Sequence, residues 1–143
     1  MKNNILSGVT IAFIIIQIVL SIVVVVSAKT IPTHWNAYGE IDAYGSCYNI
    51  LYVTAFNVLI YILLRWTSNH PEYCNFPQPF KDKEVAYANL KRFSQWIELW
   101  MSAMFLYITI GTLYHHLWIW VIFLIAGVII YTSIVWIIKL AKS

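Results

Sequence analysis

The pattern of hydrophobic and polar positions divides the chain into four long apolar stretches separated by polar segments. The stretches cover residues 5–28, 48–66, 93–113 and 117–138. Each has about 20 residues, the length that an α-helix rising about 1.5 Å per residue needs to cross roughly 30 Å of hydrocarbon. Lipid offers the backbone no hydrogen-bond partners. The pattern therefore predicts an all-α integral membrane bundle of four transmembrane helices.

Composition supports one small membrane domain spanning residues 1–143. Of the 143 residues, 61% are hydrophobic and only 10% are charged, whereas soluble domains average about 25% charged residues. The first apolar stretch is longer than the roughly 7–15 residues of a signal-peptide core, so we interpret it as a retained helix. The net charge of +3 is explained by the sidedness of membrane loops, and no nucleic-acid partner is expected.

The basic residues predict the orientation of the bundle. Eight of the nine fall on one side if both termini are cytoplasmic: Lys2, Arg65, Lys81, Lys83, Lys91, Arg92, Lys139 and Lys142. Cytoplasmic loops carry an excess of lysine and arginine, so this arrangement is the favoured one. It places a loop over residues 29–47 outside and a segment over residues 67–92 inside. From residue 82 that segment becomes helical in pattern, and we expect it to continue into the third span.

The outer loop carries an unusual set of polar and aromatic residues in the sequence IPTHWNAYGEIDAYGS, residues 31–46. The structural interpretation is a folded loop in which His34 bonds to Asp42 or to backbone, Asn36 makes a turn and Asp42 caps amides. The functional interpretation is recognition of a ligand by the same loop. Its candidate ligand-binding residues are His34, Trp35, Asn36, Gly39, Asp42 and Tyr44.

This loop resembles the signature of the SdpI-like, domain-of-unknown-function family of bacterial membrane proteins. That signature reads approximately I-P-x-H-[FWY]-N-x-x-G-x-x-D-x-[WYF]-G-S-K and directly follows a first membrane helix. The positions that agree are Ile31, Pro32, His34, Trp35, Asn36, Gly39, Asp42, Tyr44, Gly45 and Ser46. Cys47 stands where the family often has lysine. The match covers about a third of the chain.

The resemblance implies a multi-pass protein of a bacterial cytoplasmic membrane. Members of the family act as immunity proteins against a secreted peptide toxin, and as receptors that sequester a transcriptional repressor at the membrane. The expected partners are therefore the lipid bilayer, a secreted membrane-active peptide at the outer face, and a cytoplasmic protein that contacts residues 69–92. A homodimer is a further expectation, because four short helices enclose a limited interior.

Imidazole and carboxylate groups on the predicted outer face raise a second hypothesis, a divalent metal site. The candidate ligands for an ion such as zinc are His34, Asp42, His115 and His116. The spacing of His34 and Asp42 matches no familiar metal motif. His115 and His116 are adjacent, so on a helix they would point about 100° apart.

Among the polar residues inside the predicted spans, four are candidates for a structural or transport role: Gln17, Asn57, Arg65 and Glu98. Gln17 and Asn57 lie near the bilayer midplane, and we expect them to meet and hold the first two helices together. Glu98 lies near the cytoplasmic end of the third span, where Arg65 leaves the second. A structural Arg65–Glu98 pair competes with a proton or ligand role, because intramembrane carboxylates are functional candidates.

Catalytic motifs are absent from the sequence: there is no H-E-x-x-H, G-x-S-x-G or phosphate-cradling glycine loop. We therefore expect a protein that is not an enzyme and whose outer loop recognises a ligand. Two alternatives stay open. One is a small transporter or accessory subunit that uses its intramembrane polar residues, and the other is a metal-dependent membrane enzyme.

Overall fold

Four helices and one β-hairpin make up the computed structural model, which describes residues 2–74 and 80–143. The helices are α1 (Lys2–Ser27), α2 (Asn49–Asn69), α3 (Lys83–Tyr114) and α4 (Ile119–Lys142), with a short 3₁₀ turn η1 (Pro71–Tyr73) after α2. All four helices are long and apolar enough to cross a membrane. The all-α, four-helix prediction is confirmed, and the chain is a multi-pass membrane protein.

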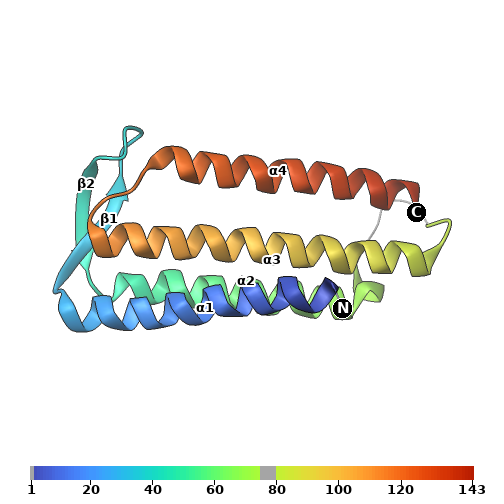
Figure 1. Ribbon diagram of the computed structural model, residues 1–143, viewed down its shortest axis with the longest axis horizontal. Helices are drawn as coiled ribbons and strands as arrows, with labels where there is room; N and C mark the ends of the chain where they lie inside the picture. Colours follow the sequence, from blue (N-terminus) through green and yellow to red (C-terminus); the bar gives the residue numbers. More distant parts are fainter. Residues whose placement is uncertain (1, 75–79) are drawn as a thin grey trace.

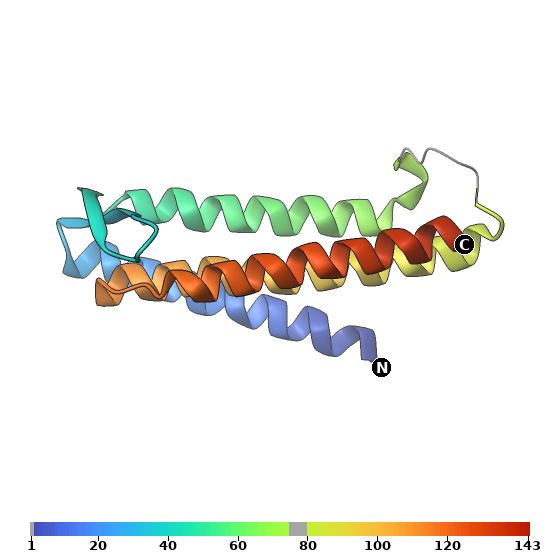
Figure 2. The ribbon, with the colours of Figure 1, turned by 90° about the horizontal axis from the view of Figure 1, so that it is seen from above.

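Helix α3 is the centre of the bundle. It contacts each of the other three helices, whereas the main helix contacts of α4 are with α3 alone. Figure 1 shows α4 stacked over α3, with α1 and α2 on the opposite side of α3. Figure 2, at right angles, shows α1 diverging from α2 toward the N-terminus. The bundle is therefore a compact α1–α2–α3 unit with α4 added on one side.

Both ends of the chain lie at one end of the bundle, and the β-hairpin lies at the other (Figure 1). We call these the terminal end and the hairpin end. At the terminal end α3 begins ten residues before the predicted third span, so the helical pattern from residue 82 does continue into the membrane helix. The Asp82 side chain caps it by accepting hydrogen bonds from the N–H groups of Glu84 and Val85.

The segment expected to be an outer loop is a two-stranded antiparallel sheet. Strand β1 (Thr30–Trp35) pairs with β2 (Ile41–Ser46), with Ile31 opposite Gly45 and Trp35 opposite Ile41. The register shifts between Pro32 and Trp35. Pro32 is tolerated because each strand of a two-stranded sheet is an edge strand, where an N–H need not be donated to a neighbour.

The interior of the α1–α2–α3 unit is rich in polar side chains, while the surface of the helices is apolar. Buried polar residues include Thr10, Gln17, Ser21, Thr54, Asn57, Glu98, Ser102 and Thr109. Exposed residues along α1 include Ile15, Val19 and Ile22, which suits contact with lipid tails. A small apolar cluster of Val24, Ile31, Cys47 and Ile50 closes the hairpin end. Interhelical contact therefore depends on hydrogen bonds as well as on packing.

Candidate functional site

The turn of the hairpin is built around Asn36. Its side-chain Oδ1 accepts hydrogen bonds from the backbone N–H groups of Tyr38 and Glu40, at 2.9 and 3.0 Å. Its Nδ2 donates to Glu40 Oε2 at 2.8 Å. The side chain of Asn36 is thus occupied in shaping the turn, as the structural interpretation expected. Its hydrogen bonds hold the neighbouring residues of the turn in place.

His34 and Asp42 join the two strands across the exposed face of the hairpin. His34 Nδ1 lies 2.5 Å from Asp42 Oδ1, and the two side chains remain 67% and 44% exposed. An ion pair at this exposure contributes at most about 1 kcal/mol to stability. The pair therefore orients two chemically active groups at the surface while leaving them accessible.

Gly39 allows the tip of the hairpin to pack closely against the connection between α3 and α4. Its φ of +83° suits glycine, and a Cβ there would lie 2.7 Å from the carbonyl oxygen of Leu117. Leu117 is buried and in turn packs on Gly111, where a Cβ would lie 2.6 Å from Leu117 Cδ1. The hairpin and the α3–α4 connection consequently form one packed cap over the bundle.

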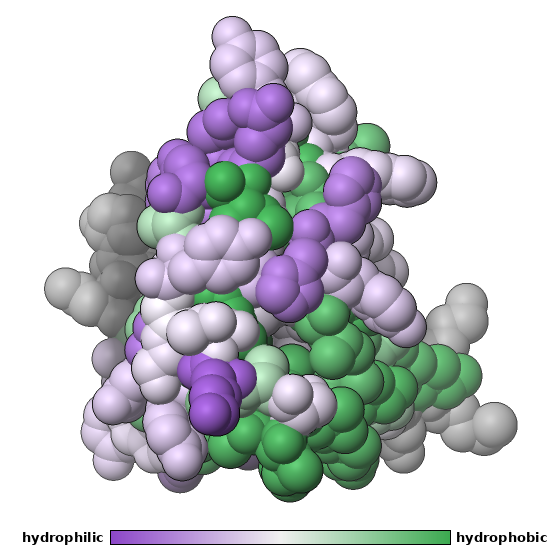
Figure 3. Space-filling model, turned by 90° about the vertical axis from the view of Figure 1, so that its left-hand side faces the viewer, coloured by the Kyte–Doolittle hydropathy of each residue, from purple (hydrophilic) through white to green (hydrophobic). Residues whose placement is uncertain are grey.

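The outward face of this cap gathers polar and aromatic side chains. Figure 3 looks onto it and shows hydrophilic residues over its upper and middle parts, with hydrophobic helix surface at the lower right. The exposed residues of the cap are His34, Tyr38, Asp42, Tyr44, His115, His116 and Trp118. The rings of Tyr44 and His115 lie 6.2 Å apart, so hairpin and connection contribute to one continuous surface.

The structure does not bring the four proposed metal ligands together. Among the described residues, no three histidine, cysteine, aspartate or glutamate side chains are grouped so that they could hold one ion. His34 and Asp42 contact each other, while His115 packs near Tyr44 and His116 near Trp118. His115 has a left-handed φ of 54° at the end of α3, which turns the chain away from the helix there.

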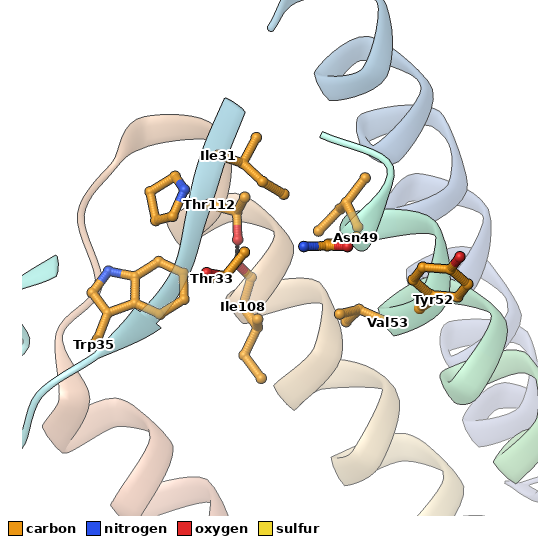
Figure 4. A pocket seen from close by; sticks show the side chains of 10 residues that line it. Ile31, Thr33, Trp35, Asn49, Tyr52, Val53, Ile108 and Thr112 are labelled. Carbon is orange, nitrogen blue, oxygen red and sulfur yellow. Dashed lines mark hydrogen bonds between the residues drawn. The ribbon is translucent and has the colours of Figure 1, made fainter. Parts of the chain in front are cut away.

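A cavity of about 300 Å³ lies beneath the hairpin, between it and the ends of α2 and α3. Strand β1 supplies Ile31, Pro32 and Trp35, the first turns of α2 supply Asn49 and Val53, and α3 supplies Ile108 and Thr112. Figure 4 shows these side chains converging from the three elements, with the amide end of Asn49 pointing toward β1. Trp35 is the one predicted ligand-binding residue among those that line the cavity.

Several polar groups at this cavity lack hydrogen-bond partners in the described part of the chain, among them the exposed hydroxyls of Thr33 and Tyr52. The Trp35 indole Nε1 is buried without a hydrogen-bond partner. The half-buried side chain of Asn49 also makes no hydrogen bond with described residues. Sequence analysis did not single out Asn49, because it is an ordinary polar residue near a helix end. Only the packing of β1 on both helices reveals the cavity.

The predicted pairs inside the membrane are present. Asn57 Nδ2 donates to Gln17 Oε1 at 2.6 Å, and Gln17 Nε2 donates to Thr109 Oγ1 at 3.3 Å. The other end of the Asn57 amide, its Oδ1, accepts a hydrogen bond from Ser102 Oγ at 3.4 Å. One connected network therefore joins α1, α2 and α3 near their middle.

Arg65 and Glu98 form a second polar cluster nearer the terminal end. Arg65 Nη2 donates to Glu98 Oε2 at 2.6 Å and to Ser7 Oγ at 3.1 Å. Glu98 Oε1 and Arg65 Nε are both buried without partners among the residues described. These two groups complement each other, because a guanidinium can bind a carboxylate through two parallel hydrogen bonds. The unpartnered oxygen of Glu98 therefore has a group of matching chemistry in the residue that already binds it.

No protein-family model, curated protein or solved structure matches this chain. The proposed function therefore rests on the chemistry and geometry of the hairpin end and of the bundle interior.

Proposed function

We propose that this protein is a receptor in a bacterial cytoplasmic membrane, whose hairpin end faces outward and recognises a secreted membrane-active peptide. The observation that carries the proposal is the preorganised cap. Asn36 holds the turn of the hairpin by hydrogen bonds, and Gly39 lets that turn pack against Leu117. The His34–Asp42 pair remains exposed on the hairpin. A rigid surface loses little conformational entropy on binding, so more of the free energy of its contacts contributes to affinity.

The chemistry of the cap fits an amphipathic peptide. Tyr38 is 88% exposed and Tyr44 is 59% exposed, and tyrosine supplies a rigid apolar ring with a polar tip. His34 and Asp42 offer hydrogen bonds and charge beside these rings. The cap lies over the hairpin ends of the apolar helices. A peptide bound in the outer leaflet would therefore be close to the cap.

The resemblance of residues 31–46 to the SdpI-like signature supports the same proposal and suggests immunity or signalling as its outcome. In this proposal the terminal end carries the cytoplasmic partner. Its described residues include the basic start of α3 and the turn η1, whereas residues 75–79 of the expected partner segment lie outside the described residues. The excess of basic residues at this end supports the orientation.

Peptide capture tests the proposal. Purified protein in lipid nanodiscs is used as bait for peptides secreted by the source organism and its neighbours. We expect wild type to retain a peptide and a His34→Ala/Asp42→Ala variant to bind it at least about tenfold more weakly, as for a pair at the centre of an interface. Equal retention by both proteins would remove the hairpin from the binding site.

The chain offers a matched control for this experiment. His70 and Glu72 form another exposed histidine–carboxylate pair, 3.2 Å apart and 45% and 52% exposed, at the terminal end. A His70→Ala/Glu72→Ala variant removes the same chemistry from the opposite side of the membrane. We expect it to retain the peptide like wild type. A loss of binding in this control as well would assign the effect to protein quality and contradict a specific outer site.

The polar interior favours a second candidate function, a small proton-coupled transporter. Gln17, Asn57 and Glu98 are all buried between α1, α2 and α3, and such groups line polar paths in transporters. This candidate predicts that Glu98→Gln lowers proton flux into liposomes while His34→Ala leaves it unchanged. The receptor proposal predicts no flux for wild type. Measurable wild-type flux that depends on Glu98 would therefore favour transport.

A further inference from the structure

The cavity beneath the hairpin lies at the depth of the membrane boundary. Asn49 is the first residue of α2, and Thr112 lies two residues before the end of α3. Both are therefore within about one helical turn, or roughly 5 Å, of the end of their helix. Tyr52, which also lines the cavity, is 75% exposed on the flank of α2. The cavity rim thus reaches the surface that contacts lipid, near the level of headgroups and ester linkages.

The cavity wall is mainly apolar and carries few polar groups. Ile31, Val53 and Ile108 supply aliphatic surface, while the Trp35 ring forms one side. The Trp35 N–H is enclosed, and the hydroxyls of Thr33 and Tyr52 belong to exposed residues of the lining. The half-buried Asn49 amide is therefore the most enclosed donor that an occupant can reach. Small-molecule sites share this composition of apolar walls with a few placed polar groups. The occupant therefore needs an apolar body and a hydrogen-bond acceptor at one end.

We propose that this cavity holds part of an acyl chain of a glycerophospholipid from the leaflet at the hairpin end, with its ester carbonyl accepting a hydrogen bond from Asn49 Nδ2. An ester has acceptors and no donors, which matches an amide N–H that lacks an acceptor. The lipid is also present at this depth in any bilayer. An apolar hollow open to lipid loses dispersion contacts if left empty, so a chain enters it favourably. This site goes beyond the receptor proposal and does not depend on it.

Native mass spectrometry of the purified protein tests the site with two lipid probes. The probes are a diester phosphatidylglycerol and the diether lipid of the same headgroup and chain length. We expect one lipid bound per wild-type protein and a preference for the diester of about three- to tenfold, the ratio expected of one hydrogen bond. Equal affinity for the two probes, or no bound lipid, would overturn the proposed ester contact.

Two variants separate the hydrogen bond from the cavity. Asn49→Asp keeps the shape of the side chain but exchanges the N–H donor for an acceptor, and we expect it to lose the diester preference. An acidic residue in the first turn of α2 also favours the helix, so this variant should fold. Val53→Phe places a larger ring in the cavity and narrows it, and we expect at least a tenfold loss for both probes. Retention of the diester preference by Asn49→Asp would contradict the assignment.

A lipid-facing substitution controls for general effects of a larger side chain. Val19 is 53% exposed on α1 and does not line the cavity. Val19→Phe should bind both probes like wild type. If Val19→Phe and Val53→Phe weaken binding equally, the lipid sits elsewhere and the proposal fails. A peptide that co-purifies with wild type and excludes both lipids would likewise overturn it.

Discussion

Replacing Glu98 with leucine is expected to lower the free energy of unfolding by about 3 kcal/mol, because it leaves the Arg65 charge without its carboxylate inside the bundle. The Glu98 side chain is fully buried, and that of Arg65 is 25% exposed. Arg65 Nη2 then keeps its hydrogen bond to the Ser7 hydroxyl and loses the one to Glu98. Thermal unfolding of the protein in detergent provides the measurement.

The free cysteines supply a reporter for that measurement. Cys47 is buried at the hairpin end, whereas Cys74 is half-buried near the terminal end. In a Cys74→Ser background, a thiol-reactive dye therefore reports unfolding through Cys47 alone. We expect the Glu98→Leu variant to expose Cys47 at a lower temperature than the Cys74→Ser parent does.

A double variant, Arg65→Leu/Glu98→Leu, distinguishes an unpaired charge from lost packing. Replacing both partners of a buried pair with apolar residues is often neutral or stabilising, whereas removing one is strongly destabilising. The double variant should therefore recover most of the stability lost in Glu98→Leu. A double variant less stable than the single one would show that Arg65 and Glu98 act through separate contacts.

Replacing Gly39 with alanine is the second change expected to have a large effect. The left-handed φ of +83° disfavours any side chain by about 1–2 kcal/mol. The new Cβ would also lie 2.7 Å from the Leu117 carbonyl oxygen, a backbone atom that cannot turn aside. Together these effects should release the hairpin from the α3–α4 connection. Hydrogen exchange of the β1 and β2 amides should become at least about tenfold faster, equivalent to roughly 1.4 kcal/mol.

Gly127 gives the control for this substitution. A Cβ on Gly127 in α4 would meet nothing within 4 Å, and alanine is the better helix former. Gly127→Ala should leave exchange in the hairpin unchanged and should not lower the melting temperature. Similar exchange rates in Gly39→Ala and wild type would mean that the stability of the hairpin does not depend on its packing against Leu117.

The helices and their internal pairs could be predicted because each depends on one clear signal. An apolar run of about 20 residues predicts a span, and the depth of Gln17, Asn57, Arg65 and Glu98 within their runs predicts which polar groups meet. Both contacts, Gln17 with Asn57 and Arg65 with Glu98, follow from the fact that lipid leaves a polar side chain no other partner. The His34–Asp42 contact was also among the predicted contacts of the outer segment.

The hairpin and its cavity could not be predicted in the same way. Pro32 interrupts β1, and strands of six residues with irregular register carry no regular alternation of apolar and polar positions. The packing of Gly39 depends on Leu117, which is distant in sequence. The cavity needs Trp35, Asn49 and Ile108 to converge from three elements. None of these contacts leaves a periodic signal in the sequence.

The central place of α3 has a consequence for how the chain is made. Helices α1 and α2 leave the ribosome first, so Gln17 and Asn57 can pair while α3 is still being synthesised. Arg65 enters the bilayer without its carboxylate partner, because Glu98 is inserted only with α3. An unmatched charge in lipid is unfavourable. Insertion of α3 is therefore the step that supplies the carboxylate partner of Arg65 and completes the polar interior of the bundle.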